Sequence, residues 1–183
     1  MADTAATLAR EQPLAGRVHA GTGVEIAPAP PAFRISLRAP GDSVAALSAA
    51  LALDLPQEPK TSAASGKRAA LWLGPDEWLV IDEKADPGAA LAGVDAPHSA
   101  VDISQRNTAI MVRGLRAADV ISHGCPQDLS LEAFSKGACS RTVFGKVEIV
   151  LHRPQAETFR IEVWRSFSDY VFDYLIDAAR DVD

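Results

Sequence analysis

The stretch Ala69-Ala70-Leu71-Trp72-Leu73-Gly74-Pro75-Asp76-Glu77-Trp78-Leu79-Val80-Ile81 decides the fold class of this 183-residue chain. It holds two short apolar runs, Ala69 to Leu73 and Trp78 to Ile81, separated by a Gly-Pro-Asp-Glu segment. Glycine and proline in such a segment favour a reversal of the chain, and short apolar runs with aromatic residues favour strands. The stretch therefore predicts an antiparallel β-hairpin.

The residues on both sides of this hairpin extend it into a first run of strands and helices. Apolar and polar side chains alternate from Phe33, which is the period of a half-buried strand, and apolar residues recur at helical spacing after residue 43. The predicted elements are a strand at 33–38, a helix capped by Asp42 or Ser43 that ends before Pro56, a loop at 57–67, a short helix at Pro87 to Leu91 and a strand at Ala100 to Ile103.

A second run of strands and helices begins at Asn107. The clearest helix of the chain is the last one, with Phe167, Val171, Tyr174, Leu175 and Ala178 as its apolar stripe. The other elements expected here are strands around residues 110–112, 139–143, 147–152 and 158–164, a helix from Leu115 to Ser122, and a cap of the final helix at Ser166 or Ser168.

Frequent antiparallel hairpins between helices favour an α+β fold over a doubly wound parallel sheet. We expect two packed ferredoxin-like α+β units, residues 33–104 and 105–183, that form one compact domain. Residues 1–32 are rich in Ala, Gly and Pro without a clear period, so they are predicted to be an extended N-terminal arm. Such an arm either moves in solvent or lies along a partner subunit.

Charge and cysteine content restrict the classes of partner and compartment. The net charge of −6 disfavours nucleic acid and anionic membrane surfaces as partners. Cys125 and Cys139 are too few for a disulfide framework, and the first residues interrupt their apolar side chains with Asp3, Arg10 and Glu11 instead of forming a secretory signal. These features predict reduced thiols, no membrane segment and a cytoplasmic location.

A search for catalytic and binding motifs finds none. Ser65-Gly66-Lys67-Arg68 lacks the first glycine and the final Ser or Thr of a phosphate-binding loop, and no C-x-x-C, H-E-x-x-H or G-x-S-x-G motif occurs. The nearest approach to a metal or thiol site is His123-Gly124-Cys125, whose spacing is weak. We therefore expect no catalytic residue, no metal site and no cofactor bound by this chain.

Aromatic residues provide the signal that remains. Trp72, Trp78 and Trp164 lie on predicted strands, and four rings crowd the last helix. Because Phe167 and Tyr174 share the core stripe, Tyr170 and Phe172 point partly elsewhere. Tyr170, Phe172 and Trp78 are therefore candidates for contact with a partner, the alternative being the core of this chain.

Three segments together resemble the sarcosine oxidase gamma subunit family: Leu73-Gly74-Pro75-Asp76-Glu77-Trp78-Leu79, Val101-Asp102-Ile103-Ser104-Gln105-Arg106, and the stretch from Arg141-Thr142-Val143 through the last helix. The resemblance covers roughly residues 33–180. It implies a fold related to the folate-binding aminomethyltransferases. In those enzymes, a strand after a Gly-rich turn carries adjacent aspartates, and the matching stretch here, residues 145–150, has the single carboxylate Glu148.

The resemblance also implies a function. The chain would be a non-catalytic gamma subunit of heterotetrameric sarcosine oxidase, an oxidoreductase that demethylates sarcosine to glycine and passes the one-carbon unit to tetrahydrofolate. The alpha, beta and delta subunits would be its partners and would hold FAD, FMN, NAD, tetrahydrofolate and zinc. The alternative is a stand-alone folate-binding protein similar to the aminomethyltransferases, with Glu148 as its candidate folate contact.

Overall fold

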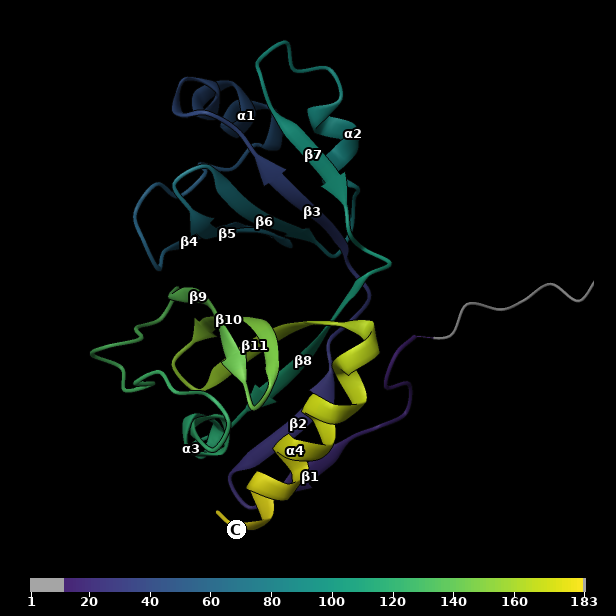
Figure 1. Ribbon diagram of the computed structural model, residues 1–183, viewed down its shortest axis with the longest axis vertical. Helices are drawn as coiled ribbons and strands as arrows, with labels where there is room; N and C mark the ends of the chain where they lie inside the picture. The colour runs from purple at the N-terminus through teal and green to yellow at the C-terminus, as the bar shows by residue number, and fades with distance from the viewer. Residues whose placement is uncertain (1–11, 183) are drawn as a thin grey trace, which may run out of the picture.

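The computed structural model describes residues 12–182 as four layers. Two helices cover the outer face of one antiparallel sheet, the inner face of that sheet lies against a second antiparallel sheet, and two further helices cover the outer face of the second sheet (Figure 1). The helices and the outer faces form two separate apolar cores, and a third apolar cluster lies between the sheets. No helix in residues 12–182 is long and apolar enough to cross a membrane.

The first sheet has five strands in the order β4-β5-β6-β3-β7. Its elements are β3 (Phe33–Arg38), a short 3-10 helix (Gly41–Ser43), α1 (Val44–Leu51), β4 (Ser62–Ser65), β5 (Arg68–Gly74), β6 (Glu77–Asp82), α2 (Pro87–Leu91) and β7 (Ser99–Asp102). The predicted hairpin is confirmed as the antiparallel pair β5 and β6, with Trp72 opposite Trp78. The predicted loop at 57–67 is wrong in part, because Ser62–Ser65 pairs with β5.

The second sheet has six strands in the order β1-β2-β8-β11-β10-β9. Its elements are β1 (His19–Gly21), β2 (Val24–Pro28), β8 (Asn107–Arg113), α3 (Ala117–Ser122), β9 (Cys139–Phe144), β10 (Val147–Gln155), β11 (Thr158–Trp164), a short 3-10 helix (Arg165–Phe167) and α4 (Ser168–Arg180). All of its neighbouring strands are antiparallel.

The N-terminal segment differs from the predicted extended arm. Residues 19–28 form a β-hairpin, and its second strand pairs with β8 so that Ile26 lies opposite Val112. Val24 and Ile26 are 3% and 0% exposed. The alternation of Val24, Glu25 and Ile26 within a segment rich in Ala, Gly and Pro is too short to predict a strand. The strand forms because its backbone pairs with the edge of β8. The part of the predicted arm at residues 1–11 lies outside the described residues.

The two sheets share one strand order. Read from the edge, β4-β5-β6-β3-β7 in the first sheet corresponds to β9-β10-β11-β8-β2 in the second. In the first sheet, β7 lies beside β3 and follows it in the chain. In the second sheet, the corresponding strand beside β8 is β2, which comes from the N-terminal segment. The second unit is therefore completed by residues that precede the first unit in the sequence.

Gly114, directly after β8, fastens the N-terminal hairpin to the second sheet. Its φ is +119°, and a Cβ atom there would lie 2.2 Å from the carbonyl oxygen of Gly23. The Arg116 amide donates a hydrogen bond of 3.0 Å to that same oxygen. A glycine is needed here because both the backbone conformation and the close approach exclude a side chain.

Helix α4 confirms most of the predicted apolar stripe. Val171, Leu175 and Ala178 are buried against the second sheet, while Tyr174 is half-buried. Phe167 is 42% exposed, which corrects its assignment to the stripe. It ends the 3-10 turn before α4 instead of lying within the helix, so the helical period does not apply to it.

Candidate functional site between the two sheets

The inner faces of the two sheets meet in a layer that contains an apolar cluster and, beside it, buried charged side chains. The apolar cluster consists of Leu71, Leu79, Ile81, Ile103 and Cys139. Strand alternation places every second side chain of the inner strands in this layer. On β11 these include Arg160 and Glu162, which are 7% and 1% exposed, so a polar strand face that would otherwise meet water is covered by the first sheet.

A buried Arg-Glu-Arg group links the two units. Arg34 Nε on β3 donates a hydrogen bond of 2.6 Å to Glu162 Oε2, and Arg160 Nε donates one of 2.7 Å to Glu162 Oε1. The three residues are 4%, 7% and 1% exposed for Arg34, Arg160 and Glu162. Since a buried carboxylate needs charge compensation, Glu162 depends on both guanidinium groups.

A second ionic contact between the inner faces of the sheets involves two arginines that are partly exposed to solvent. Glu77 on β6 accepts hydrogen bonds from Arg141 on β9 and from Arg38 on β3, the latter at 2.8 Å. Burial alone would raise the pKa of Glu77, but the hydrogen bonds and charges of Arg141 and Arg38 outweigh it, so this pKa lies below its ordinary value. The contact therefore favours the ionised carboxylate.

The nucleophilic and acid-base side chains in this layer are held in structural contacts. Burial, together with the charge of Arg160, lowers the pKa of His152 to about 4, and its Nε2 lies 3.2 Å from Ser62 Oγ. Burial raises the pKa of the Cys139 thiol to about 12, and its Sγ donates to the Thr61 carbonyl at 3.1 Å. At neutral pH the imidazole is therefore neutral and the thiol protonated, each with a pKa far from 7. Such groups are suited to packing and poorly suited to acid-base or nucleophilic catalysis.

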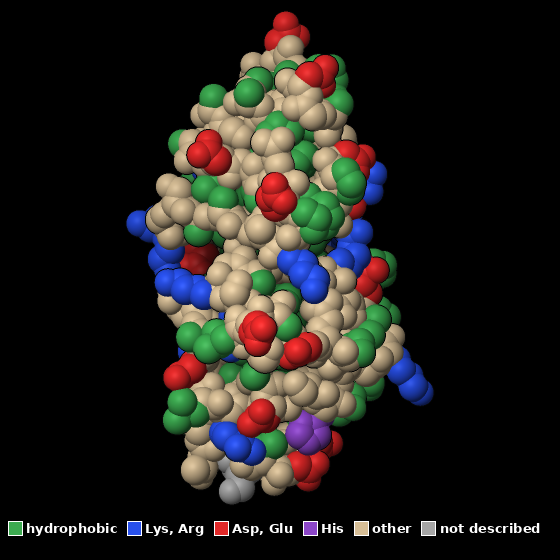
Figure 2. Space-filling model, turned by 90° about the vertical axis from the view of Figure 1, so that its left-hand side faces the viewer, with side chains coloured by type: hydrophobic (Ala, Val, Ile, Leu, Met, Phe, Trp, Pro, Cys, Tyr) green, Lys and Arg blue, Asp and Glu red, His purple; other side chains and the backbone are tan. Residues whose placement is uncertain are grey.

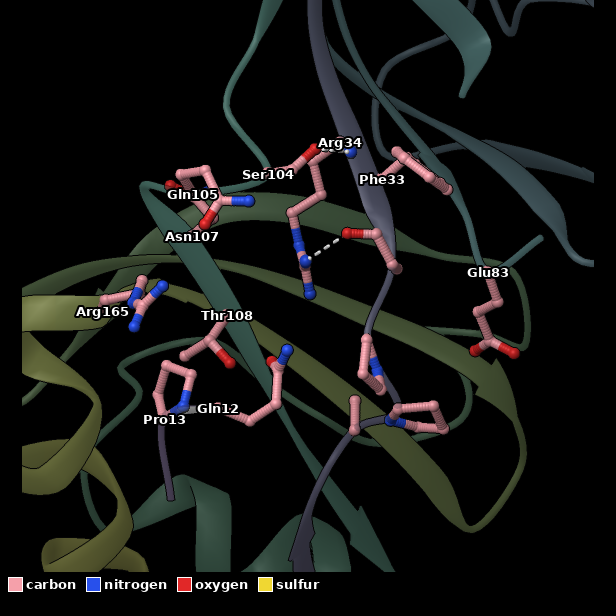
Figure 3. A pocket seen from close by; sticks show the side chains of 14 residues that line it. Gln12, Pro13, Phe33, Arg34, Glu83, Ser104, Gln105, Asn107, Thr108 and Arg165 are labelled. Atoms are coloured by element: carbon pink, nitrogen blue, oxygen red, sulfur yellow. Dashed lines mark hydrogen bonds between the residues drawn. The ribbon is translucent and has the colours of Figure 1, made fainter. Parts of the chain in front are cut away.

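Two hollows in this region border Arg34 and Glu148. The larger one, about 270 Å³, lies along the linker between β2 and β3. Figure 3 shows Arg165 and Glu83 at its opposite ends with Arg34 between them, and Asn107 and Thr108 also line it. The smaller one, about 50 Å³, is lined by Glu148 and Trp78 among others. Figure 2 shows Lys and Arg side chains on both sides of the waist between the two units.

Comparison with known proteins identifies the family. A model of the sarcosine oxidase gamma subunit family matches residues 38–181. The chain belongs to this family. It is 33% identical over 153 residues to the sarcosine oxidase subunit gamma of Corynebacterium sp. (strain P-1), and the match covers 80% of this chain and 75% of the relative. The subunit gamma from Arthrobacter sp. is 32% identical over 156 residues, again covering 80% and 75%.

Two solved structures have a similar fold. One chain of the heterotetrameric sarcosine oxidase from Corynebacterium sp. U-96, solved with pyrrole 2-carboxylate, superposes with a TM-score of 0.87 at 28% identity, covering 94% of this chain and 95% of that one. The glycine cleavage system aminomethyltransferase T from Bartonella henselae superposes with a TM-score of 0.60 at 12% identity, covering 87% of this chain and 49% of that one. The second likeness concerns the fold alone.

The structure corrects two of the three predicted partner contacts of this gamma-subunit family member. Trp78 and Phe172 are each 1% exposed, so neither has surface to offer another chain. Trp78 packs in the core under α1, where its Nε1 donates a hydrogen bond of 2.6 Å to the Pro56 carbonyl. Phe172 packs against the second sheet under the Arg17 guanidinium. Tyr170, at 41% exposed, remains a surface residue.

Two exposed aromatic residues were missed by the sequence prediction. Trp164 and Phe167 are 44% and 42% exposed, and their ring centroids are 6.2 Å apart. The Arg106 guanidinium lies 5.2 Å from the centre of the Trp164 ring. The sequence did contain one signal for the exposure of Trp164. It is the last residue of a predicted strand, and residues at strand ends are often left uncovered by neighbouring elements. Trp164, Phe167 and Tyr170 are called the aromatic patch below.

The structure also shows the surroundings of Glu148, the carboxylate that is the candidate folate contact. Glu148 is exposed on β10, opposite Val143 on β9. Its side of the strand faces the hollow of about 50 Å³, which is small beside the 300–1,000 Å³ of ordinary organic-ligand sites. Within residues 12–182, no three His, Cys, Asp or Glu side chains are grouped so that they could hold a metal ion.

Proposed function

We propose that this chain is the gamma subunit of a heterotetrameric sarcosine oxidase. The observation that carries the proposal is the superposition on a chain of such an oxidase with a TM-score of 0.87 over 94% of this chain and 95% of that one. A match over nearly the full length of both chains, joined to 33% identity with a named gamma subunit, supports the same position in an assembly. Its partners would be the alpha, beta and delta subunits.

The role proposed for the chain within that oxidase is non-catalytic. His152 and Cys139 lie in the layer between the sheets. Both are hydrogen-bonded to neighbouring polar groups, and their pKa values are unsuited to proton transfer or nucleophilic attack at neutral pH. FAD, FMN, NAD, tetrahydrofolate and zinc would then be held by the partner subunits. The oxidative demethylation of sarcosine would take place on those subunits.

The two units are proposed to be ferredoxin-like. In each, four antiparallel strands alternate with two helices on one face, and the strand order β7-β3-β6-β5 is matched by β2-β8-β11-β10. One additional edge strand, β4 or β9, extends each unit. This order supports the proposal for the first unit directly and for the second unit with β2 standing in for a strand after α4.

The aromatic patch is the surface we assign to contact with a partner subunit. Trp164, Phe167 and Tyr170 are 41–44% exposed, the ring centroids of Trp164 and Phe167 are 6.2 Å apart, and Tyr170 follows in the first turn of α4. Adjacent exposed rings are more typical of interfaces than of free surfaces. This patch replaces the three residues expected from the sequence, of which Tyr170 is retained.

The alternative function, a stand-alone folate-binding protein, has weaker support. The likeness to aminomethyltransferase T extends over 49% of that enzyme at 12% identity. A pteridine with its side chain needs a cavity several times larger than the hollow of about 50 Å³ beside Glu148.

Cys125 and Cys139 are both buried and unpaired, which agrees with the cytoplasmic location proposed for the oxidase.

An affinity pull-down of the tagged full-length chain from its own cell extract tests the proposed function. The other three subunits should be eluted with it, the eluate should absorb between about 350 and 500 nm from bound flavin, and it should oxidise sarcosine. A colourless eluate with the chain alone, or a coloured one that does not act on sarcosine, would contradict the proposal. Titration of the purified chain with tetrahydrofolate then tests the alternative.

A further inference from the structure

A third cleft lies between the sheets on the other side of the linker that joins β2 to β3. It measures about 300 Å³ and is bordered by the turn between β4 and β5 and by the inner faces of β8, β10 and β11. Pro30 of the linker and Glu83 border both this cleft and the one shown in Figure 3. The two clefts are therefore neighbours separated by the linker.

Basic side chains dominate the charged lining of this cleft. Lys67, Arg68, Arg113 and Arg160 line it, and the one acidic side chain among its lining residues is Glu83. The whole chain carries a net charge of −6, so the excess of cations here runs against the overall charge. Lys67 and Arg113 are about half exposed and mark the mouth, whereas Arg160 lies at the base.

Arg160 has hydrogen-bonding capacity that the described residues do not use. Its Nε donates to Glu162, and its Nη1 lies 3.6 Å from Glu83 Oε1, but its buried Nη2 has no hydrogen-bond partner. The residue is 7% exposed. An unsatisfied buried donor on a cation costs free energy, and an arginine edge is matched to the two oxygens of a carboxylate.

The other charged groups leave Arg113 available to a ligand. Arg113 pairs with Glu25 at 3.1 Å, and both side chains are about half exposed, so this contact is weak and easily exchanged. Arg68 is bound to Asp82 at 2.8 Å and to the Leu51 carbonyl, which leaves it a structural role. A ligand entering between Lys67 and Arg113 would thus meet Arg113 first and Arg160 at the base.

The walls of the cleft are apolar. Ala64, Ala69, Ile81, Met111 and Pro154 line it beside the basic side chains. A bare inorganic anion would leave these walls without a partner. We propose that this cleft binds a small organic carboxylate, whose charged group contacts Arg160 and Arg113 and whose hydrocarbon body lies against these walls.

The two methionines of the sequence make a direct test possible, because Met111 lines the cleft and Met1 is the other one. The full-length chain, labelled at the methionine methyl groups, is titrated with acetate, butyrate and hexanoate at constant ionic strength while methyl NMR signals are followed. The Met111 signal should shift saturably. Affinity should rise by about two- to fourfold for each added methylene group, and 1-hexanol should bind far more weakly than hexanoate.

Two variants of exposed arginines, each paired with one carboxylate, separate the site from general charge effects. Arg113→Ala should weaken hexanoate binding by about tenfold through loss of one charge-assisted hydrogen bond, whereas Arg180→Ala should leave it within about twofold. Arg180 is an exposed arginine paired with Asp177 on α4 and does not line the cleft.

Three results would overturn the proposal. These are no saturable shift of Met111 up to about 50 mM hexanoate, equal affinity for 1-hexanol, or equal weakening by the two variants. Each result is obtained on the purified chain, so it does not depend on whether the chain assembles with oxidase subunits.

Discussion

Arg34 on β3 and Glu162 on β11 are joined by a hydrogen bond of 2.6 Å that crosses from one sheet to the other, and both side chains are at most 4% exposed. The same Glu162 carboxylate also binds Arg160. One buried carboxylate therefore compensates two buried guanidinium groups, and the packing of the two units depends on it.

Glu162→Gln should destabilise the chain by about 3–5 kcal/mol, because it leaves Arg34 buried without a counter-charge and Arg160 with only the more distant Glu83, at 3.6 Å. The free energy of unfolding, measured by urea denaturation of the full-length chain, checks this. Glu25→Gln is the matched control, since it removes an exposed carboxylate paired with Arg113 and should cost less than about 1 kcal/mol. A loss below about 1 kcal/mol for Glu162→Gln would show that the carboxylate is not required.

His152 should make stability depend on pH between about 6.5 and 4. Its folded-state pKa lies below the unfolded value, so the unfolded chain takes up a proton first as the pH falls, and stability drops until the folded pKa is reached. The drop should amount to roughly 3 kcal/mol over the interval, and His152→Gln should remove it. Urea denaturation curves at several pH values measure the effect, and identical profiles for both proteins would contradict it.

Gly114→Ala should destabilise the chain by about 3 kcal/mol or more, because the new Cβ would lie 2.2 Å from the Gly23 carbonyl oxygen at a φ of +119°. Gly66→Ala is the control: φ is +60° there and no atom lies within 4 Å of the added Cβ, so about 1 kcal/mol is expected. Thermal unfolding of both variants separates the clash from backbone strain. Equal losses of stability in the two variants would mean that the N-terminal hairpin shifts to relieve the clash at no measurable cost.

The double substitution Phe167→Ser and Tyr170→Ser should reduce co-purification of the partner subunits by at least about tenfold, while the isolated chain keeps its stability. Both residues are more than 40% exposed, so little packing within the chain is lost. Leu131→Ser, at a position 56% exposed and outside the patch, is the matched control. Unchanged recovery with the double variant would remove the aromatic patch as the interface.

Cys125 and Cys139 should resist alkylation in the native chain at pH 8, since they are 3% and 0% exposed. Burial also raises the pKa of Cys139 to about 12, which keeps its thiolate scarce. Mass spectrometry after iodoacetamide treatment should find both thiols unmodified in buffer and both modified in 8 M urea, a concentration of roughly the order that unfolds small domains. Rapid native labelling of Cys139 would contradict the structural role assigned to it.

Local patterns were sufficient wherever one element buries one face. The hairpin of β5 and β6, the pair β9 and β10, and the stripe of α4 all follow from runs and periods within a few residues. Phe167 was misassigned because a 3-10 turn precedes α4 and changes the spacing. Short strands such as Val24–Pro28 and Ser62–Ser65 carried too weak a pattern, and their partners in the sheet, far away in sequence, determine them.

The sequence by itself determined the α+β class, most of the strands and helices, and the family resemblance, because each depends on hydrophobic period, turn residues or short motifs. The burial of Arg34 and Glu162 was decided by tertiary structure alone. An arginine alternating with apolar residues on a strand indicates a solvent-facing side, and only the packing of the second sheet against that side turns it into an interior. The site between the sheets, with its clefts and buried ion pairs, exists for that reason.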